Sequence, residues 1–104
     1  MVKKNGQITT EVLLFLNEVK KIYTIDKVYI FGSYAKGMAT NWSDIDLAII
    51  SRDFSDEIFD DRLYLMKIAN RFDDRIEPTL YSPSNFSLND PLVAEICKNG
   101  VQVI

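Results

Sequence analysis

The chain has 104 residues, of which 47 % are hydrophobic, and a formal net charge of −3 from 12 basic and 15 acidic side chains. A chain of this length holds one hydrophobic core, so we expect residues 1–104 to form a single domain. The absence of histidine excludes histidine metal sites and catalytic pairs of histidine with serine or cysteine. The acidic balance argues against direct nucleic-acid binding, and no apolar run approaches the roughly 20 residues that cross a membrane, so we expect a cytoplasmic protein.

The first predicted element is an amphipathic helix that packs on a sheet. Its apolar residues recur at three- and four-residue intervals, and they are Ile8, Val12, Phe15, Leu16, Val19, Ile22 and Tyr23. Two strands follow, over residues 28–32 and 45–51. Their runs Val28-Tyr29-Ile30-Phe31 and Leu47-Ala48-Ile49-Ile50 have the composition of buried strands.

The second half of the chain predicts a helix, a strand, a helix and a strand in turn. Ser55 is a candidate N-cap for a helix from about Asp56 to Phe72. The apolar residues of this helix form a broad stripe, which we expect to lie mainly in the core, with part of it available to a partner. They are Ile58, Phe59, Leu63, Met66, Ala69 and Phe72. The remaining predicted elements are a strand over 75–81, a turn over 82–85, a helix from Pro91 to Lys98 ended by Asn99-Gly100, and a strand over 101–104.

Cys97, the one cysteine, falls in the last predicted helix, where we expect a buried thiol. Taken together, the elements predict an α/β domain with a small mixed sheet and helices packed on it.

The segment from Gly32 to Asp46 connects the first two predicted strands and joins a glycine-serine pair to two aspartates. Gly32 stands where the first strand ends. Without a Cβ it lets backbone N–H groups approach phosphate oxygens, and the hydroxyl of Ser33 adds one more donor. This part of the segment therefore predicts a phosphate-binding turn.

Asp44 and Asp46 make up the second half of this segment. Residues two apart on a strand point to the same face, so the two carboxylates lie side by side while Ile45 and Leu47 face the core. Two like charges at the edge of an apolar sheet repel each other unless a cation or a shared proton relieves them. Hard oxygen ligands favour Mg²⁺ or Mn²⁺, with ligand positions left for water and substrate phosphates.

The pattern Gly32-Ser33, a spacer of ten residues and Asp44-Ile45-Asp46 resembles the signature of the minimal nucleotidyltransferase family, a branch of the DNA polymerase β-like superfamily. The resemblance extends along nearly the whole chain in the order of its elements. It implies a polymerase β-like nucleotidyltransferase fold. It also implies an enzyme that binds a nucleoside triphosphate with Mg²⁺ and transfers the nucleoside monophosphate to an acceptor.

Such a site needs a third carboxylate, from a neighbouring strand, to complete the metal site and act as general base. Glu77 is our candidate, because it alternates with Ile76 and so can face the side of the aspartates. Pro78 cannot donate to a ladder and indicates an edge strand or a strand end. The family more often has aspartate at this place. Asp74 is the alternative, although its parity places it with Ile76.

Four residues near the motif have two interpretations each. Lys36 lies one helical turn past Gly32, where the family often has a basic residue, and it either binds the triphosphate or is an exposed lysine. Trp42 either stacks on a base or, as we expect, packs against the edge of the sheet. Ser43 directly precedes the carboxylates, and we expect it to order the loop instead of touching substrate. Arg52 is a further candidate for a phosphate contact, or a residue without one.

Among small members of the family, the chain resembles in particular the antitoxin of HEPN/MNT toxin–antitoxin pairs. This resemblance implies transfer of AMP from ATP to a tyrosine of a partner HEPN-domain ribonuclease, which silences this toxin within a hetero-oligomer. The residues implied are Asp44, Asp46 and Glu77 for the metal and catalysis, and Gly32, Ser33 and Lys36 for the nucleotide. Two alternatives stay open, namely a small-molecule nucleotidyltransferase and a non-catalytic module that neutralises its partner by contact.

Overall fold

The fold is built around a four-stranded sheet with the strand order β3-β2-β1-β4. The computed structural model describes residues 8–40, 42–55 and 58–104. Along the chain the elements are α1 (Thr10–Lys20), β1 (Lys27–Phe31), β2 (Ile45–Ile50), α2 (Ile58–Asn70), β3 (Ile76–Tyr81), α3 (Pro91–Asn99) and β4 (Val101–Gln102). Each element lies within a few residues of the range that the sequence pattern predicts.

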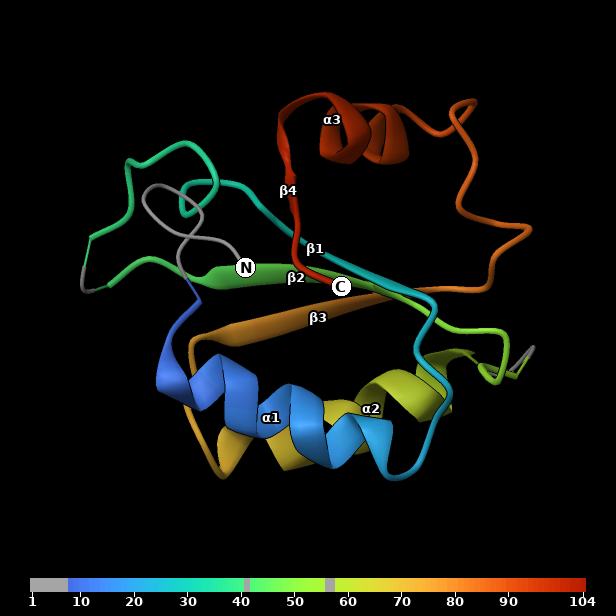
Figure 1. Cartoon of the computed structure of the whole chain (residues 1–104), viewed down its shortest axis with the longest axis horizontal. Helices are drawn as coiled ribbons and strands as arrows, with labels where there is room; N and C mark the ends of the chain where they lie inside the picture. The colour runs from blue at the N-terminus through green and yellow to red at the C-terminus, as the bar shows by residue number, and fades with distance from the viewer. Residues whose placement is uncertain (1–7, 41, 56–57) are drawn as a thin grey trace.

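The sheet is mixed, as the sequence predicts. β1 pairs antiparallel with β2 and with β4, whereas β2 pairs parallel with β3. The antiparallel connection from β1 to β2 carries the Gly32–Asp46 segment, and the parallel connection from β2 to β3 runs through α2 (Figure 1). Parallel neighbours need such a crossover, because the chain must return to the other end of the sheet.

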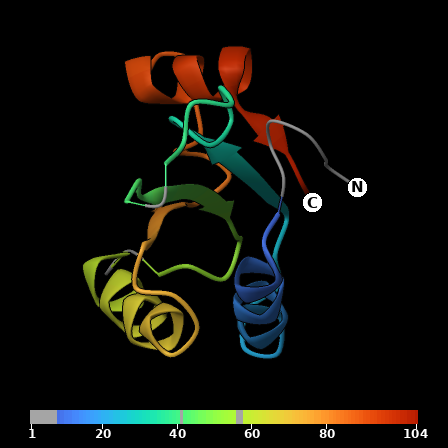
Figure 2. The same ribbon diagram turned by 90° about the vertical axis from the view of Figure 1, so that its left-hand side faces the viewer.

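Helices cover both faces of the sheet. α1 and α2 lie on one face and α3 lies on the other, as the two views at right angles agree (Figures 1 and 2). β2 has Leu47 and Ile49 in the core beneath α1 and α2, and Ala48 and Ile50 in a smaller cluster beside α3. Burial on both faces explains why the sequence of β2 is a continuous apolar run after Asp46.

Short side chains cap two of the helices. The Thr9 side chain accepts a hydrogen bond from Val12 N at the start of α1, 3.1 Å long. Asp90 accepts one from Leu92 N at the start of α3, where Pro91 occupies the first turn. α3 ends at Asn99, before Gly100, as predicted.

The predicted core face of α2 is wrong in part. The helix buries Leu65, Ile68 and Ala69, whereas Phe59 is 67 % exposed and Leu63 is 45 % exposed. The apolar residues of this helix cover two adjacent stripes, and contact with β3 decides which stripe is buried. The predicted start of the helix at Asp56 lies outside the described residues. Ser55 is described, and its N and Oγ donate to Asp61 Oδ2 at 2.8 and 3.1 Å.

The prediction of a buried Cys97 is also wrong, because the thiol is exposed. The nine-residue α3 buries only Val93 and Ile96, and Cys97, four residues after Val93, lies at the margin of this narrow buried stripe. Within the described part of the chain, the helices are too short and too polar to cross a bilayer.

Candidate functional site

Gly32 ends β1 with a left-handed backbone, at a φ of +74°. This region favours glycine, since a side chain there is strained. A Cβ at this position would also overlap Asp46 Oδ2 and lie 3.4 Å from Asp46 Cγ. Two features therefore favour glycine at position 32. One is the left-handed turn, and the other is the carboxylate of Asp46, which lies against the backbone of Gly32.

The turn after Gly32 continues as a short helical loop. Lys36 N donates to Gly32 O at 3.3 Å, and Met38 N donates to Ser33 O at 2.9 Å. Lys36 therefore lies one helical turn past Gly32, as the sequence suggests. Its Nζ is 3.9 Å from Glu95 Oε2 on α3, and both side chains are about half exposed.

A second turn, from Thr40 to Ser43, leads the chain into the carboxylates. Thr40 N donates to Ser43 Oγ at 2.9 Å, and Ser43 N donates to Thr40 O at 3.1 Å. The expectation that Ser43 orders the loop is confirmed. The expectation that Trp42 packs against the sheet edge is wrong, because Trp42 is 90 % exposed.

Asp46 lies in the middle of the site. Its Cα partner on the antiparallel side is Phe31, next to Gly32, and its Cα partner on the parallel side is Glu77. Partner residues on adjacent strands project to the same face, so Glu77 lies beside Asp46 on the face that carries α3. Asp44 is exposed, two residues before Asp46 and immediately ahead of β2.

Asp46 is affected by its burial and by the two neighbouring carboxylates. Partial burial raises the pKa of Asp46, and the negative charges of Asp44 and Glu77 raise it further. Asp74, the alternative third carboxylate, is exposed in the turn before β3, outside the strand pairing that brings Glu77 to Asp46. An ionised Asp46 in this position is costly unless a positive charge offsets it.

The chain matches the model of the nucleotidyltransferase domain family over residues 13–100. It belongs to that family. A relative, Putative protein adenylyltransferase MJ1305 of Methanocaldococcus jannaschii, is 33 % identical over 98 residues. The alignment covers 86 % of this chain and 66 % of the relative, so the chain spans just under two thirds of that protein's length.

Solved structures of toxin–antitoxin pairs are similar to this nucleotidyltransferase domain. A chain in a mutant of the toxin–antitoxin MntA-HpeT is 28 % identical with a TM-score of 0.63, and the match covers 94 % of this chain and 73 % of that one. A toxin–antitoxin structure with AMP-PNP is 28 % identical with a TM-score of 0.62, covering 88 % and 68 %. The complex of a tri-AMPylated Shewanella oneidensis HEPN toxin with its MNT antitoxin is 27 % identical with a TM-score of 0.52, covering 86 % and 69 %.

Two arginines lie beside the candidate site, and the sequence pattern alone does not indicate them. Arg75 pairs with Asp73 at 2.8 Å before β3, and its Nη1 donates to Tyr34 Oη in the turn after Gly32 at 3.0 Å. Arg62 of α2 donates from Nε to Pro78 O at 2.8 Å, and its Nη2 lies 3.6 Å from Glu77 Oε1. The carbonyl of Pro78 faces outward because β3 is an edge strand, as Pro78 itself predicts.

The donor set of Asp44, Asp46 and Glu77 fits a hard divalent cation, since all three supply carboxylate oxygens. The raised pKa of Asp46 indicates that a cation there would relieve a real repulsion. Among residues 8–40, 42–55 and 58–104, however, no three acidic, histidine or cysteine side chains are already gathered closely enough to hold a metal ion. Glu77 has its carboxylate beside Arg62 instead.

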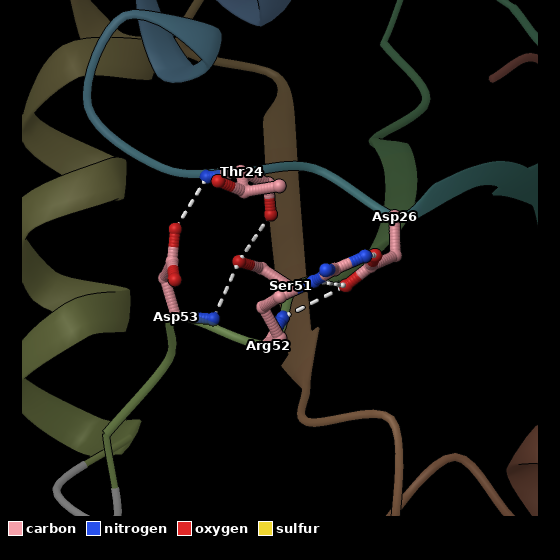
Figure 3. Close-up of polar contacts among 5 residues, drawn as sticks. All are labelled: Thr24, Asp26, Ser51, Arg52 and Asp53. Atoms are coloured by element: carbon pink, nitrogen blue, oxygen red, sulfur yellow. Dashed lines mark hydrogen bonds and ion pairs between the residues drawn. The ribbon is translucent and has the colours of Figure 1, made fainter.

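Arg52 follows the end of β2, whereas Asp46 and Gly32 lie where β2 begins. Its guanidinium pairs with Asp26, and its backbone N donates to Asp26 Oδ2 at 2.9 Å. Figure 3 shows the network around this pair, in which Ser51 Oγ donates to Thr24 O at 2.6 Å and accepts from Asp53 N at 3.0 Å. Arg52 thus joins two loops at the end of the sheet that lies away from Gly32.

Proposed function

We propose that this protein transfers AMP from ATP, with Mg²⁺, to a tyrosine hydroxyl of a partner HEPN-domain toxin and thereby acts as its antitoxin. The contact of Gly32 with Asp46, beside Glu77 in register, carries the proposal, because it joins a phosphate-binding turn to paired carboxylates. Similar solved structures include one with AMP-PNP and one with an AMPylated HEPN toxin, and these support the nucleotide and the acceptor.

In this proposal, the turn from Gly32 to Lys36 binds the triphosphate. Gly32 lets the backbone approach the β- and γ-phosphates, and Ser33 supplies a hydroxyl donor. Lys36, half exposed beside Glu95, adds a positive charge toward the phosphates. The exposed Trp42 flanks the same loop, where a ring without packing partners in the core suits contact with the nucleotide base or the partner protein.

The carboxylates hold the metal and receive the proton. Asp44, Asp46 and Glu77 would hold Mg²⁺, which when bound neutralises charge on the phosphates and on the leaving group. The tyrosine oxygen forms a bond to the α-phosphorus, the bond to the bridging oxygen breaks, and pyrophosphate leaves with its electron pair. Glu77 accepts the proton of the tyrosine hydroxyl. The site therefore acts by orientation and charge neutralisation.

The test incubates the purified protein with α-labelled ATP, Mg²⁺ and lysate of its own source, and resolves labelled material by size. Asp46→Asn removes the central carboxylate, and Asp60→Asn, an exposed aspartate in the first turn of α2, is the matched control. We expect a labelled protein band with the wild type and with Asp60→Asn only. Label confined to small molecules would identify a small-molecule nucleotidyltransferase, and no label dependent on Asp46 would contradict catalysis by this site.

A further inference from the structure

Arg62 makes two different contacts at the outer edge of β3. Its Nε hydrogen-bonds to the carbonyl of Pro78 at 2.8 Å, which fixes the guanidinium beside the strand. Its Nη2 is then 3.6 Å from Oε1 of Glu77. The two side chains of this ion pair are 40 % and 37 % exposed, so the pair lies at the rim of the site and not in the core.

Glu77 lies between an attractive and a repulsive neighbour. Arg62 attracts its carboxylate from the outer edge of β3, and its Cα partner on the other side is Asp46, which carries a like charge. Without a cation, the carboxylate of Glu77 is more stable beside Arg62 than beside the aspartates. This preference accounts for the finding that the described carboxylates are not already gathered into a metal-binding group.

The ion pair between Arg62 and Glu77 is weak enough to break. A separation of 3.6 Å exceeds the roughly 2.7–3.2 Å of an N–H···O hydrogen bond, so the attraction is electrostatic without a hydrogen bond. Solvent screens a pair that is more than one third exposed. A divalent cation carries twice the charge of the guanidinium and offsets the negative charges of the two aspartates, so its binding removes the repulsion that keeps the carboxylate of Glu77 away from them.

We propose that Arg62 is a positioning residue that holds the carboxylate of Glu77 at the outer edge of β3 and releases it when a divalent cation binds at Asp44 and Asp46. This inference rests on the proposed function for the role of the three carboxylates. Arg62 and the cation compete for Glu77, so Arg62 weakens cation binding. The Nε contact with Pro78 keeps the arginine at the edge after Glu77 leaves it.

The test is a double-mutant cycle read out as Mn²⁺ affinity, without nucleotide or acceptor, by electron paramagnetic resonance of free Mn²⁺. The cycle compares the wild type, Arg62→Gln, Glu77→Gln and the double variant. Lys67→Gln removes an exposed positive charge from the same helix and is the control for net charge. Circular dichroism establishes folding. Arg62→Lys, which keeps the charge but not the planar fork, gives a second measurement if Arg62→Gln does not fold.

We expect Arg62→Gln to bind Mn²⁺ about two- to five-fold more tightly than the wild type, the range for a partly exposed ion pair. Arg62→Lys should show a smaller increase in Mn²⁺ affinity than Arg62→Gln. Lys67→Gln should bind Mn²⁺ with the affinity of the wild type. In the Glu77→Gln background, Arg62→Gln should give no gain, because no carboxylate is left to release. An equal gain in both backgrounds, or a loss of affinity in Arg62→Gln, would overturn the inference.

AMP transfer by the wild type separates this inference from the proposed function. If transfer depends on Asp46 but Mn²⁺ affinity shows no coupling between Arg62 and Glu77, the inference alone fails. If the wild type neither binds Mn²⁺ nor transfers AMP, both fail.

Discussion

Gly32 combines two requirements of the site in one residue. The backbone needs a left-handed conformation where β1 ends, and the space for a side chain is occupied by the carboxylate of Asp46. The sequence identifies Gly32 and Asp46 as members of one motif, yet it does not reveal that they touch. This contact depends on the register of β1 with β2, which pairs Phe31 with Asp46.

Replacing Gly32 by alanine should abolish AMP transfer, because the new methyl group displaces Asp46. Gly37→Ala is a matched control, since Gly37 has nearly the same φ, +73°, in the same loop. Each variant should lose about 1 kcal/mol or more of unfolding free energy from the left-handed backbone. Urea unfolding and the labelled-ATP assay measure the two effects. Equal transfer by the two variants would contradict the importance of the Gly32 contact with Asp46.

Asp46→Asn should abolish transfer while it stabilises the fold at neutral pH. Burial and two like charges raise the pKa of Asp46, so the folded state takes up this proton more readily than the unfolded state does. Ionised Asp46 therefore destabilises the fold above its raised pKa, and this cost disappears as the pH falls below the ordinary value of 3.8. Urea unfolding of both proteins from pH 7 downward measures the difference. A less stable Asp46→Asn at pH 7 would contradict this account.

α2 shows why an element can be predicted while its buried face is not. Periodicity over residues 58–70 predicts a helix, but two adjacent apolar stripes satisfy the same pattern. Packing against β3 buries the stripe that contains Leu65 and leaves Phe59 and Leu63 exposed. The first two strands are easier to predict, because their short apolar runs and the turn residues around them agree. The positions of Arg62 and Arg75 depend on tertiary packing, which a pattern of spacing does not contain.

Two leucines of α2 test its orientation directly. Leu65 is fully buried, so Leu65→Ala should cost about 2–5 kcal/mol of unfolding free energy. Leu63→Ala deletes the same atoms at a position that is 45 % exposed, and it should cost about 1 kcal/mol or less. Chemical denaturation compares the two. Equal losses would show that the helix packs with a different face.

The candidate site and the hydrogen-bond network around Arg52 lie at opposite ends of the sheet. The turn at Gly32 and the carboxylates lie where β2 begins, whereas Arg52 and Asp26 join loops where β2 ends. From the sequence alone, Arg52 is a candidate for phosphate contact because it is a basic residue just past the predicted strand, yet six residues of extended strand already separate it from Asp46 by about 20 Å. The strand register excludes that contact.

Arg52→Gln should therefore leave AMP transfer unchanged and lower the stability of the fold. Arg52 lowers the pKa of Asp26, so the stability from this pair is present above 3.8 and is lost as the pH falls through the lowered value. Thermal unfolding at neutral pH should show a lower midpoint for the variant. A large loss of transfer in a folded Arg52→Gln would place Arg52 in the site, against the structure.

The intact mass of the partner protein tests the central claim most directly. A HEPN-domain partner is coexpressed with the wild type, with Asp46→Asn or with Asp60→Asn, and is purified for mass spectrometry with mapping of the modified residue. We predict one or more added AMP groups on tyrosine with the wild type and with Asp60→Asn, and an unmodified partner with Asp46→Asn. An unmodified partner in all three samples, still neutralised by the wild type, would contradict catalysis and establish neutralisation by contact alone.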